Sequence, residues 1–358
     1  MKQLTVMLKP ASSLCNLRCS YCFYDDISSL REVSSFGIMT ESVARTVLDH
    51  ILTELEAGDR LTLSFQGGEP TLAGLDFYRN LTEYIKQKKT EVQIFYTIQT
   101  NGLLLNEEWC EFLTENHVLI GISCDILSQA HDHARTDEKK NGTYRRVVET
   151  IRRLTRYRVE YNVLCTLTRQ IARHPKQVWN EIKKLGIEYV QFTPCLRDLT
   201  FALTPERFAS FYQELFDLWY KELCDGQYRS VKLFDDLVQL LSRGLVTACG
   251  IGGYCQPQIV VEADGTVYPC DFYCLDPFAV GNLTRDSLRT VYERSAVSAC
   301  KKREKLPVLC GDCRYRKLCG GGCRRMQEEV CCSFEDTYCG YRDFLNHIWE
   351  RLVKISRR

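Results

Sequence analysis

Three cysteines near the N-terminus have the spacing of an iron–sulfur ligand loop. Cys15, Cys19 and Cys22 form a C-x3-C-x2-C motif just after the first apolar run. Three thiolates hold three irons of a [4Fe–4S] cube and leave the fourth iron open for an exchangeable ligand. S-adenosylmethionine can fill that position, and one electron then releases a 5′-deoxyadenosyl radical. Zinc is the alternative, but it usually takes a fourth nearby Cys or His, which this loop lacks.

A second set of cysteines dominates the C-terminal third. Its eight members suffice for two further four-thiolate cubes. They are Cys249, Cys255, Cys270, Cys310, Cys313, Cys319, Cys323 and Cys339. Cys331 or Cys332 competes with Cys339 as a ligand. A zinc knuckle shares the C-x2-C-x5-C spacing and stays open as an alternative, whereas the near-neutral charge disfavours a nucleic-acid knuckle.

Polar residues follow several predicted strands, where a nucleotide-like cofactor would bind. Gly67, Gly68 and Glu69 close the second strand, and the glycines can bring backbone groups close to the methionine moiety. Ser123 closes the fourth strand, where its hydroxyl can reach a ribose. Arg135 lies beyond it and can pair with the methionine carboxylate. A Gly-Gly pair alone more often forms only a turn. The prediction of a cofactor site therefore depends on the combination of these polar residues at several strand ends.

The elements that must position these residues alternate between strand and helix patterns. Strands are predicted at 4–9, 60–66, 91–99, 118–124, 159–168 and 189–195. Helices are predicted at 41–57, 75–88, 107–115, 144–157 and 176–185, with Thr40 as an N-cap and Gly58 as a stop. Six successive βα units predict an α/β fold with a parallel sheet, whose functional residues gather at the C-terminal strand ends.

The pattern changes after Pro205. Two helices, at 205–223 and 232–242, precede a hairpin in QIVVEADGTVYPCDF with Asp264-Gly265 as its turn. Cysteines become frequent from Cys249 onward. We therefore predict a barrel domain over 1–244, a cluster domain over 245–345 and a helical tail over 346–358.

Composition narrows the class of protein. The chain has 358 residues, 45% of them hydrophobic, a formal charge of +1 and 20 cysteines. The charge predicts no partner among nucleic acids or anionic membranes, and no apolar run reaches 18 residues. Because the N-terminus lacks an export signal, the clustered cysteines indicate metal ligation in a reducing cytoplasm instead of disulfides.

Five segments of the chain resemble those of a known family. The segments KPASSLCNLRCSYCFY, SFQGGEPTLAG, IQTNG, VVEADGTVYPCDFY and CGDCRYRKLCGGGCRR look like those of the anaerobic sulfatase-maturating enzymes. These are radical S-adenosylmethionine proteins with a C-terminal SPASM domain. The resemblance runs from about residue 9 to residue 341 and implies a partial (β/α)6 barrel followed by a SPASM domain with two auxiliary [4Fe–4S] clusters.

The resemblance also implies roles for individual residues. Those against S-adenosylmethionine would be Tyr21, Tyr24, Gly67, Ser123, Arg135 and Leu196. The inner auxiliary cluster would take Cys249, Cys255, Cys270 and Cys323, and the outer one Cys310, Cys313, Cys319 and Cys339. Asp271 would accept a proton while a Cys or Ser of a sulfatase peptide is oxidised to Cα-formylglycine.

Two departures from the family pattern concern the substrate side of the barrel. Ile126 stands where the family often has glycine, and the segment after Cys195 is shorter than expected. A thioether or other crosslink on a ribosomally made peptide is therefore the second hypothesis, although no leader-peptide domain precedes the barrel. A cluster-bearing electron carrier is the third, but a carrier gains nothing from an open iron. The first two need a low-potential donor of the flavodoxin or ferredoxin type.

Overall fold

The computed structural model describes residues 2–196, 200–253, 255–298, 306–326 and 338–357. Contacts between Cα atoms divide the chain into two compact units, each built from distant segments. The first contains Met1–Ser123, Arg135–Tyr161 and Pro257–Lys302. The second contains Cys124–Ala134, Asn162–Gln256 and Arg303–Arg358. No helix in the described ranges is long and apolar enough to span a membrane.

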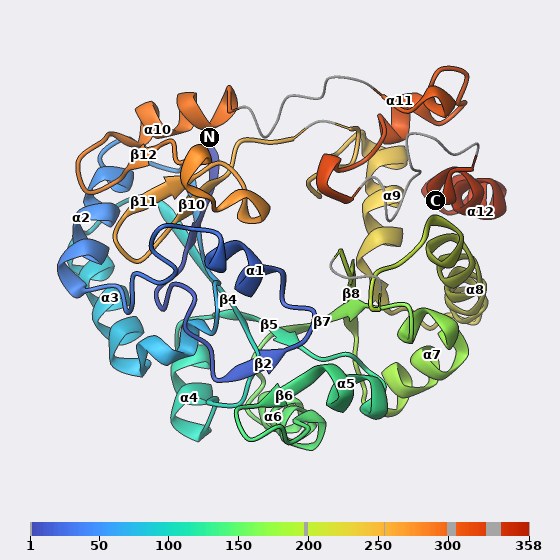
Figure 1. Ribbon diagram of the computed structural model, residues 1–358, viewed down its shortest axis with the longest axis horizontal. Helices are drawn as coiled ribbons and strands as arrows, with labels where there is room; N and C mark the ends of the chain where they lie inside the picture. Colours follow the sequence, from blue (N-terminus) through green and yellow to red (C-terminus); the bar gives the residue numbers. More distant parts are fainter. Residues whose placement is uncertain (1, 197–199, 254, 299–305, 327–337, 358) are drawn as a thin grey trace. The chain divides into compact units, whose positions relative to one another are not determined.

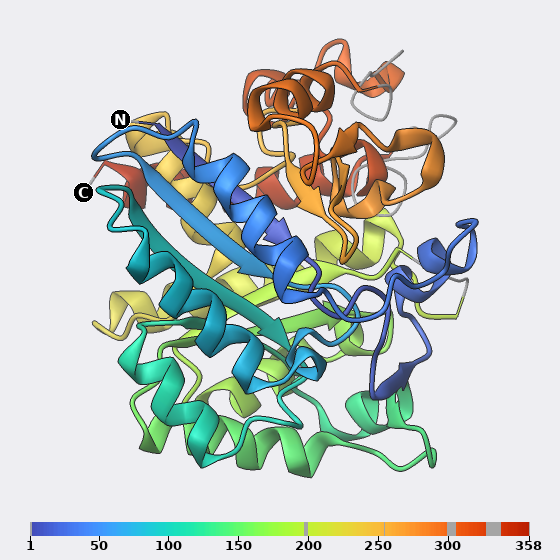
Figure 2. The same ribbon diagram turned by 90° about the vertical axis from the view of Figure 1, so that its left-hand side faces the viewer.

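The first unit contains four parallel strands in the order β1-β3-β4-β5. They are β1 (Gln3–Leu8), β3 (Arg60–Phe65), β4 (Gln93–Thr100) and β5 (Leu119–Ser123). The helices that follow them are α2 (Glu41–Leu52), α3 (Leu75–Gln87), α4 (Glu107–Glu115) and α6 (Tyr144–Arg156), and Figures 1 and 2 show α2 and α3 packed along one side of the strands. The predicted α/β alternation is therefore confirmed.

The first long helix, α2, begins as predicted and ends early. Thr40 accepts a hydrogen bond from the Val43 backbone N–H, which confirms the N-cap. The helix ends at Leu52, however, so the prediction that Gly58 stops it was wrong. Tight turns follow the helix, in which the backbone N–H groups of Glu54 and Leu55 donate to the carbonyls of Ile51 and Leu52. The Asp59 carboxylate then accepts hydrogen bonds from the backbone N–H groups of Glu56 and Lys2.

The predicted hairpin forms, and it extends the sheet of the first unit. β10 (Ile259–Val261) and β11 (Thr266–Tyr268) pair antiparallel, and β12 (Gly281–Asn282) follows. β10 also pairs in parallel with β1, placing Val261 opposite Leu8. Residues more than 250 positions apart are thereby neighbours at the end of β1.

The second unit contains three parallel strands and an aromatic core. The strands are β7 (Tyr161–Leu167), β8 (Tyr189–Pro194) and β9 (Ser230–Val231). The helices are α5 (Ser128–Ala134), α7 (Pro175–Lys184), α8 (Pro205–Cys224), α9 (Lys232–Arg243) and α12 (Gly340–Ser356). Tyr212 on α8 lies 5.6 Å from Phe344 on α12 and 6.1 Å from Phe234 on α9, measured between ring centroids. These rings join the last helix to the unit.

Candidate active site

The three thiols of the N-terminal loop come together in the first unit. Cys19 ends the short strand β2 (Leu17–Cys19), and Cys22 is the N-cap residue of α1 (Phe23–Ser29). Burial raises the pKa of Cys15 to about 12, and Cys19 and Cys22 are among the neighbours that add to the rise. Thiols this close to one another suit a cationic cluster, because metal coordination deprotonates them and balances their charge. The donor set therefore fits the predicted three-thiolate site.

Gly67 and Gly68 are required by the cysteine loop itself. A Cβ on Gly67 would lie 2.7 Å from the Ser12 carbonyl oxygen, and one on Gly68 would lie 2.2 Å from that of Leu14. The Gly68 N–H donates to the Ser12 carbonyl at 2.9 Å. The sequence suggested that these glycines approach a cofactor, but their close approach in the structure is to the cysteine loop.

Replacing Gly68 by alanine is expected to displace the cysteine loop. The new Cβ would overlap the Leu14 carbonyl, which is backbone and cannot move without moving Cys15. We expect the iron content to fall by up to about one-third, the share of one cluster in three, and S-adenosylmethionine cleavage to fall with it. Gly58→Ala is the control, since it introduces backbone strain at φ +81° in open space. Equal iron contents in the two variants would contradict this account.

Glu69 ties three chain segments together beneath the loop. Its side chain is 1% exposed. One oxygen accepts from the Thr100 hydroxyl and the other from the Asn101 N–H, both at 2.7 Å. The Asn101 amide in turn donates to Asn16 of the cysteine loop, also at 2.7 Å. Burial raises the pKa of Glu69, and these hydrogen bonds oppose the rise. Glu69 thus anchors the ends of β3 and β4 to the loop.

Arg135 lies beside the cysteine loop. It begins β6 (Arg135–Asp137), which pairs antiparallel with β2 so that Arg135 is opposite Cys19. Its guanidinium lies 5.4 Å from the centre of the Tyr21 ring. A guanidinium beside a three-thiolate loop can pair with a carboxylate ligand. Two other predicted contacts lie at strand ends: Ser123 ends β5 in the first unit, and Leu196 follows β8 in the second unit.

Ile126 adopts the backbone conformation that glycine favours. Its φ is +60° and its side chain is fully buried. A β-branched residue there costs on the order of 1–3 kcal/mol, which the burial of the side chain can offset. The preceding Asp125 is held by a hydrogen bond from the Thr166 N–H at 3.1 Å. The sequence departure at this position therefore keeps a left-handed turn. Residues 197–199, in the other departing segment, lie outside the described residues.

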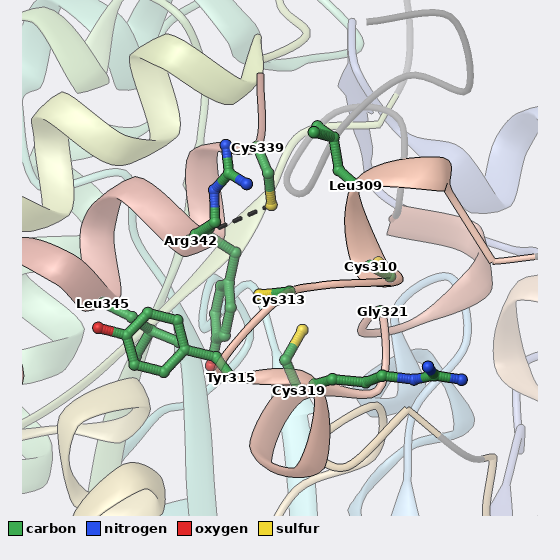
Figure 3. Close-up of a pocket in the computed structure, with 11 residues that line it drawn as sticks. Leu309, Cys310, Cys313, Tyr315, Cys319, Gly321, Cys339, Arg342 and Leu345 are labelled. Carbon is green, nitrogen blue, oxygen red and sulfur yellow. Dashed lines mark hydrogen bonds between the residues drawn. The ribbon is translucent and has the colours of Figure 1, made fainter. Parts of the chain in front are cut away.

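Four thiols surround one pocket of the second unit. Cys310, Cys313, Cys319 and Cys339 all line it, and Figure 3 shows them coming from separate turns of the chain. The Arg342 N–H donates to the Cys339 sulfur at 3.4 Å, at the start of α12. No three His, Cys, Asp or Glu side chains within the described ranges converge to hold a single metal ion. Thiols arranged around a space suit a cluster of several irons. Cys331 and Cys332 lie outside the described residues.

Three of the four proposed inner ligands lie on loops that pack against each other. Gly250, which follows Cys249, is so close to Cys323 that an added Cβ would lie 2.9 Å from the cysteine Cβ. The Gly252 N–H donates to the Leu318 carbonyl at 3.2 Å in the same pair of loops. Cys255 ends this glycine-rich segment. The fourth proposed ligand, Cys270, belongs to the first unit.

Removing one auxiliary thiol is expected to reduce iron content and peptide modification together. We expect this of Cys249→Ala and of Cys313→Ala, because each leaves a four-thiolate site with three ligands. Some reductive cleavage of S-adenosylmethionine should survive, since the separate N-terminal loop would hold the radical cluster. Cys224→Ala, an exposed thiol at the end of α8, is the control. Parent-like iron content in both test variants would remove these thiols from the ligand set.

Asp271 is held by a buried lysine. The Lys9 ammonium donates to Asp271 Oδ1 at 2.6 Å, and the lysine side chain is 1% exposed against 21% for the aspartate. Burial alone would lower the pKa of Lys9, but Asp271 and other anionic neighbours raise it well above the ordinary value. Lys9 is therefore a cation beside the predicted proton acceptor.

Sequence reasoning missed this network. Lys9 also lies 3.6 Å above the centre of the Tyr24 ring, and the Tyr24 hydroxyl donates to Glu262. Arg31 pairs with Glu262 at 2.7 Å, and both side chains are fully buried. Tyr24 is 3% exposed, and its hydroxyl is hydrogen-bonded within this network. Its contact with the cofactor stays a prediction. The sequence did hold a signal for this network, namely charged residues within apolar segments. Lys9 stands at the end of the first strand, and Glu262 stands inside the hairpin.

Of the six described cysteines that are not assigned to a cluster, all but Cys224 are buried. Cys165 and Cys195 are buried in the second unit. Cys274 is fully buried against Tyr24, Val260 and Tyr268.

Comparison with known proteins agrees with this site. Residues 10–185 match the family model of the radical SAM superfamily, and residues 239–314 match that of an iron–sulfur cluster-binding domain, SPASM. A cysteine-type anaerobic sulfatase-maturating enzyme of Clostridium novyi is 39% identical over 337 residues, which are 92% of this chain and 90% of the relative. A serine-type enzyme of Bacteroides thetaiotaomicron is 27% identical over 345 residues, covering 90% and 83%.

A solved structure is similar along nearly the whole chain. Native anSMEcpe with bound AdoMet and Kp18Cys peptide superposes with a TM-score of 0.89 at 34% identity, covering 99% of both chains. The partial-barrel and SPASM architecture inferred from the sequence is thereby confirmed. By the extent of these similarities, the chain belongs to the anaerobic sulfatase-maturating enzymes of the radical SAM superfamily.

Proposed function

We propose that this protein oxidises a cysteine residue in a sulfatase peptide to Cα-formylglycine. The observation that carries the proposal is Asp271, a carboxylate fixed by a buried cation and directly following Cys270, a proposed cluster ligand. Similarity adds the substrate class, because the cysteine-type relative is 39% identical and the serine-type relative 27%. The solved structure with a bound Cys peptide supports a peptide as the ligand.

The reaction removes two protons and two electrons from the target cysteine. S-adenosylmethionine and the radical cluster, when bound, supply the radical that takes one hydrogen atom from Cβ. Asp271 then accepts the thiol proton, and the auxiliary cluster that Cys270 would help to hold would supply the acceptor for the remaining electron. A C=S double bond forms, and water hydrolyses it to the aldehyde with loss of hydrogen sulfide. A positioned carboxylate assists because a free thiol has a pKa of about 8.5.

The chain's thiols would hold three [4Fe–4S] clusters in total. The barrel would occupy 1–244, the auxiliary domain 245–345 and a helical tail 346–358, and the SPASM match over 239–314 supports the first boundary. Tyr21, Tyr24, Gly67, Gly68, Glu69, Ser123, Arg135 and Leu196 would form or support the S-adenosylmethionine site. A flavodoxin- or ferredoxin-type protein would supply low-potential electrons in the reducing cytoplasm.

Mass spectrometry of peptides after anaerobic turnover tests the proposal. A sulfatase peptide with a target Cys and a matched peptide with Ser would be incubated with the reconstituted enzyme. We expect formylglycine from the Cys peptide at the higher rate. A crosslinked product that keeps its sulfur would instead support the second hypothesis, and formylglycine from the Ser peptide alone would overturn the substrate assignment.

A further inference from the structure

The two oxygens of the Asp271 carboxylate have different surroundings. Oδ1 accepts the hydrogen bond from Lys9 at 2.6 Å. Oδ2 accepts none from any described residue, and the side chain is 21% exposed. The carboxylate is therefore held from its buried side, and its second oxygen remains available to another molecule.

Lys9 is itself immobilised at both ends. Its backbone N–H donates to Val261 of β10 at 2.9 Å, and its carbonyl accepts from Ser12 of the cysteine loop at 3.0 Å. Its ammonium contacts the Tyr24 ring, and the side chain is 1% exposed. A lysine with no free rotamer fixes the position of the oxygen that it binds.

Charge balance allows such a lysine to stay buried. Lys9 and Arg31 contribute two positive charges, and Glu262 and Asp271 contribute two negative charges. A buried charge is very costly unless it is paired and hydrogen-bonded. The Tyr24 hydroxyl links the two pairs by donating to Glu262 while the ring receives Lys9.

We propose that Lys9 is the positioning residue of the oxidation: it anchors Oδ1 of Asp271 so that Oδ2 faces the substrate thiol. This inference rests on the proposed role of Asp271 as proton acceptor. Lys9 acts through Asp271 and does not touch the peptide. Its backbone also holds the cysteine loop, so one residue sets both the loop and the proton acceptor in place.

Lys9→Met tests the inference because it keeps the length of the side chain and removes the donor. We expect iron content and 5′-deoxyadenosine formation near the parent values. Formylglycine formed per 5′-deoxyadenosine should fall on the order of 10²-fold, the cost of a reacting group displaced by about 1 Å. Lys88→Met is the matched control. Lys88 also pairs with an aspartate, Asp49 at 2.8 Å, and lies 4.7 Å above the Tyr84 ring, but it is 38% exposed.

A double-mutant comparison separates positioning from general structural damage. If Lys9 acts only through Asp271, Lys9→Met should cause no further loss in an Asp271→Asn background. Additive losses, or an unchanged product ratio in the single variant, would overturn the inference. Lys9→Gln, which keeps a hydrogen-bond donor, should recover part of the ratio and replaces Lys9→Met if that variant does not fold. If the parent enzyme makes no formylglycine, the proposed function fails instead, and this outcome is visible before any variant is made.

Discussion

An enzyme in which Cys15, Cys19 and Cys22 are all replaced by alanine is expected to cleave no S-adenosylmethionine. Reductive cleavage needs the iron that those thiolates leave open. About two-thirds of the iron should remain, because the eight thiolates proposed as auxiliary ligands would still hold two four-iron clusters. The four thiols around the pocket in Figure 3 lie in the second unit and do not depend on this loop.

Anaerobic iron and sulfide analysis measures the remaining clusters, and chromatography of 5′-deoxyadenosine measures the cleavage of S-adenosylmethionine. The control is a triple substitution of thiols that we do not assign to any cluster, Cys110, Cys165 and Cys224. If this variant folds, its iron content and its 5′-deoxyadenosine formation should persist. Continued 5′-deoxyadenosine formation in the Cys15, Cys19 and Cys22 variant would refute the cofactor site. Loss of nearly all the iron would instead show that the clusters assemble together.

Asp271→Asn is expected to reduce the formylglycine yield on the order of 10²-fold or more, the usual scale for a lost general base. The amide keeps the shape of the side chain and an oxygen for Lys9 but does not accept the substrate proton. Iron content and 5′-deoxyadenosine formation should continue. The loss should be at least as severe on a Ser peptide as on a Cys peptide, because the hydroxyl is the weaker acid.

The same substitution is also expected to lower the melting temperature, because buried Lys9 loses its counter-charge. Removing one partner of a fully buried pair costs about 3–5 kcal/mol, and the partial exposure of Asp271 makes the cost smaller. Asp276→Asn is the control, since the Asp276 carboxylate accepts a hydrogen bond from the Glu32 backbone N–H and lies outside the proposed mechanism. Formylglycine yield equal to that of the parent in Asp271→Asn would exclude Asp271 from the reaction.

Local features of this protein were predictable from the sequence. The βα alternation follows from hydrophobic periodicity, the start of α2 from the Thr40 cap, and the β10–β11 turn from Asp264-Gly265. The radical-cluster thiols follow from C-x3-C-x2-C, because ligands within eight residues of one another need no long-range contact to converge. The end of α2 was misjudged because tight turns follow Leu52, and a hydrophobic pattern does not register backbone turns.

Only the tertiary structure decided what surrounds the proton acceptor. Lys9 and Asp271 are 262 positions apart, and they meet because β10 pairs in parallel with β1. Strand pairing over that distance depends on which sheet edge the hairpin covers, and periodicity carries no information about this choice. The need for glycine at position 68 also comes from the tertiary structure, because the Leu14 carbonyl occupies the space where a Cβ would lie. The sequence by itself determined the chemistry of the ligands, and the pairing of distant strands determined which charges stand beside them.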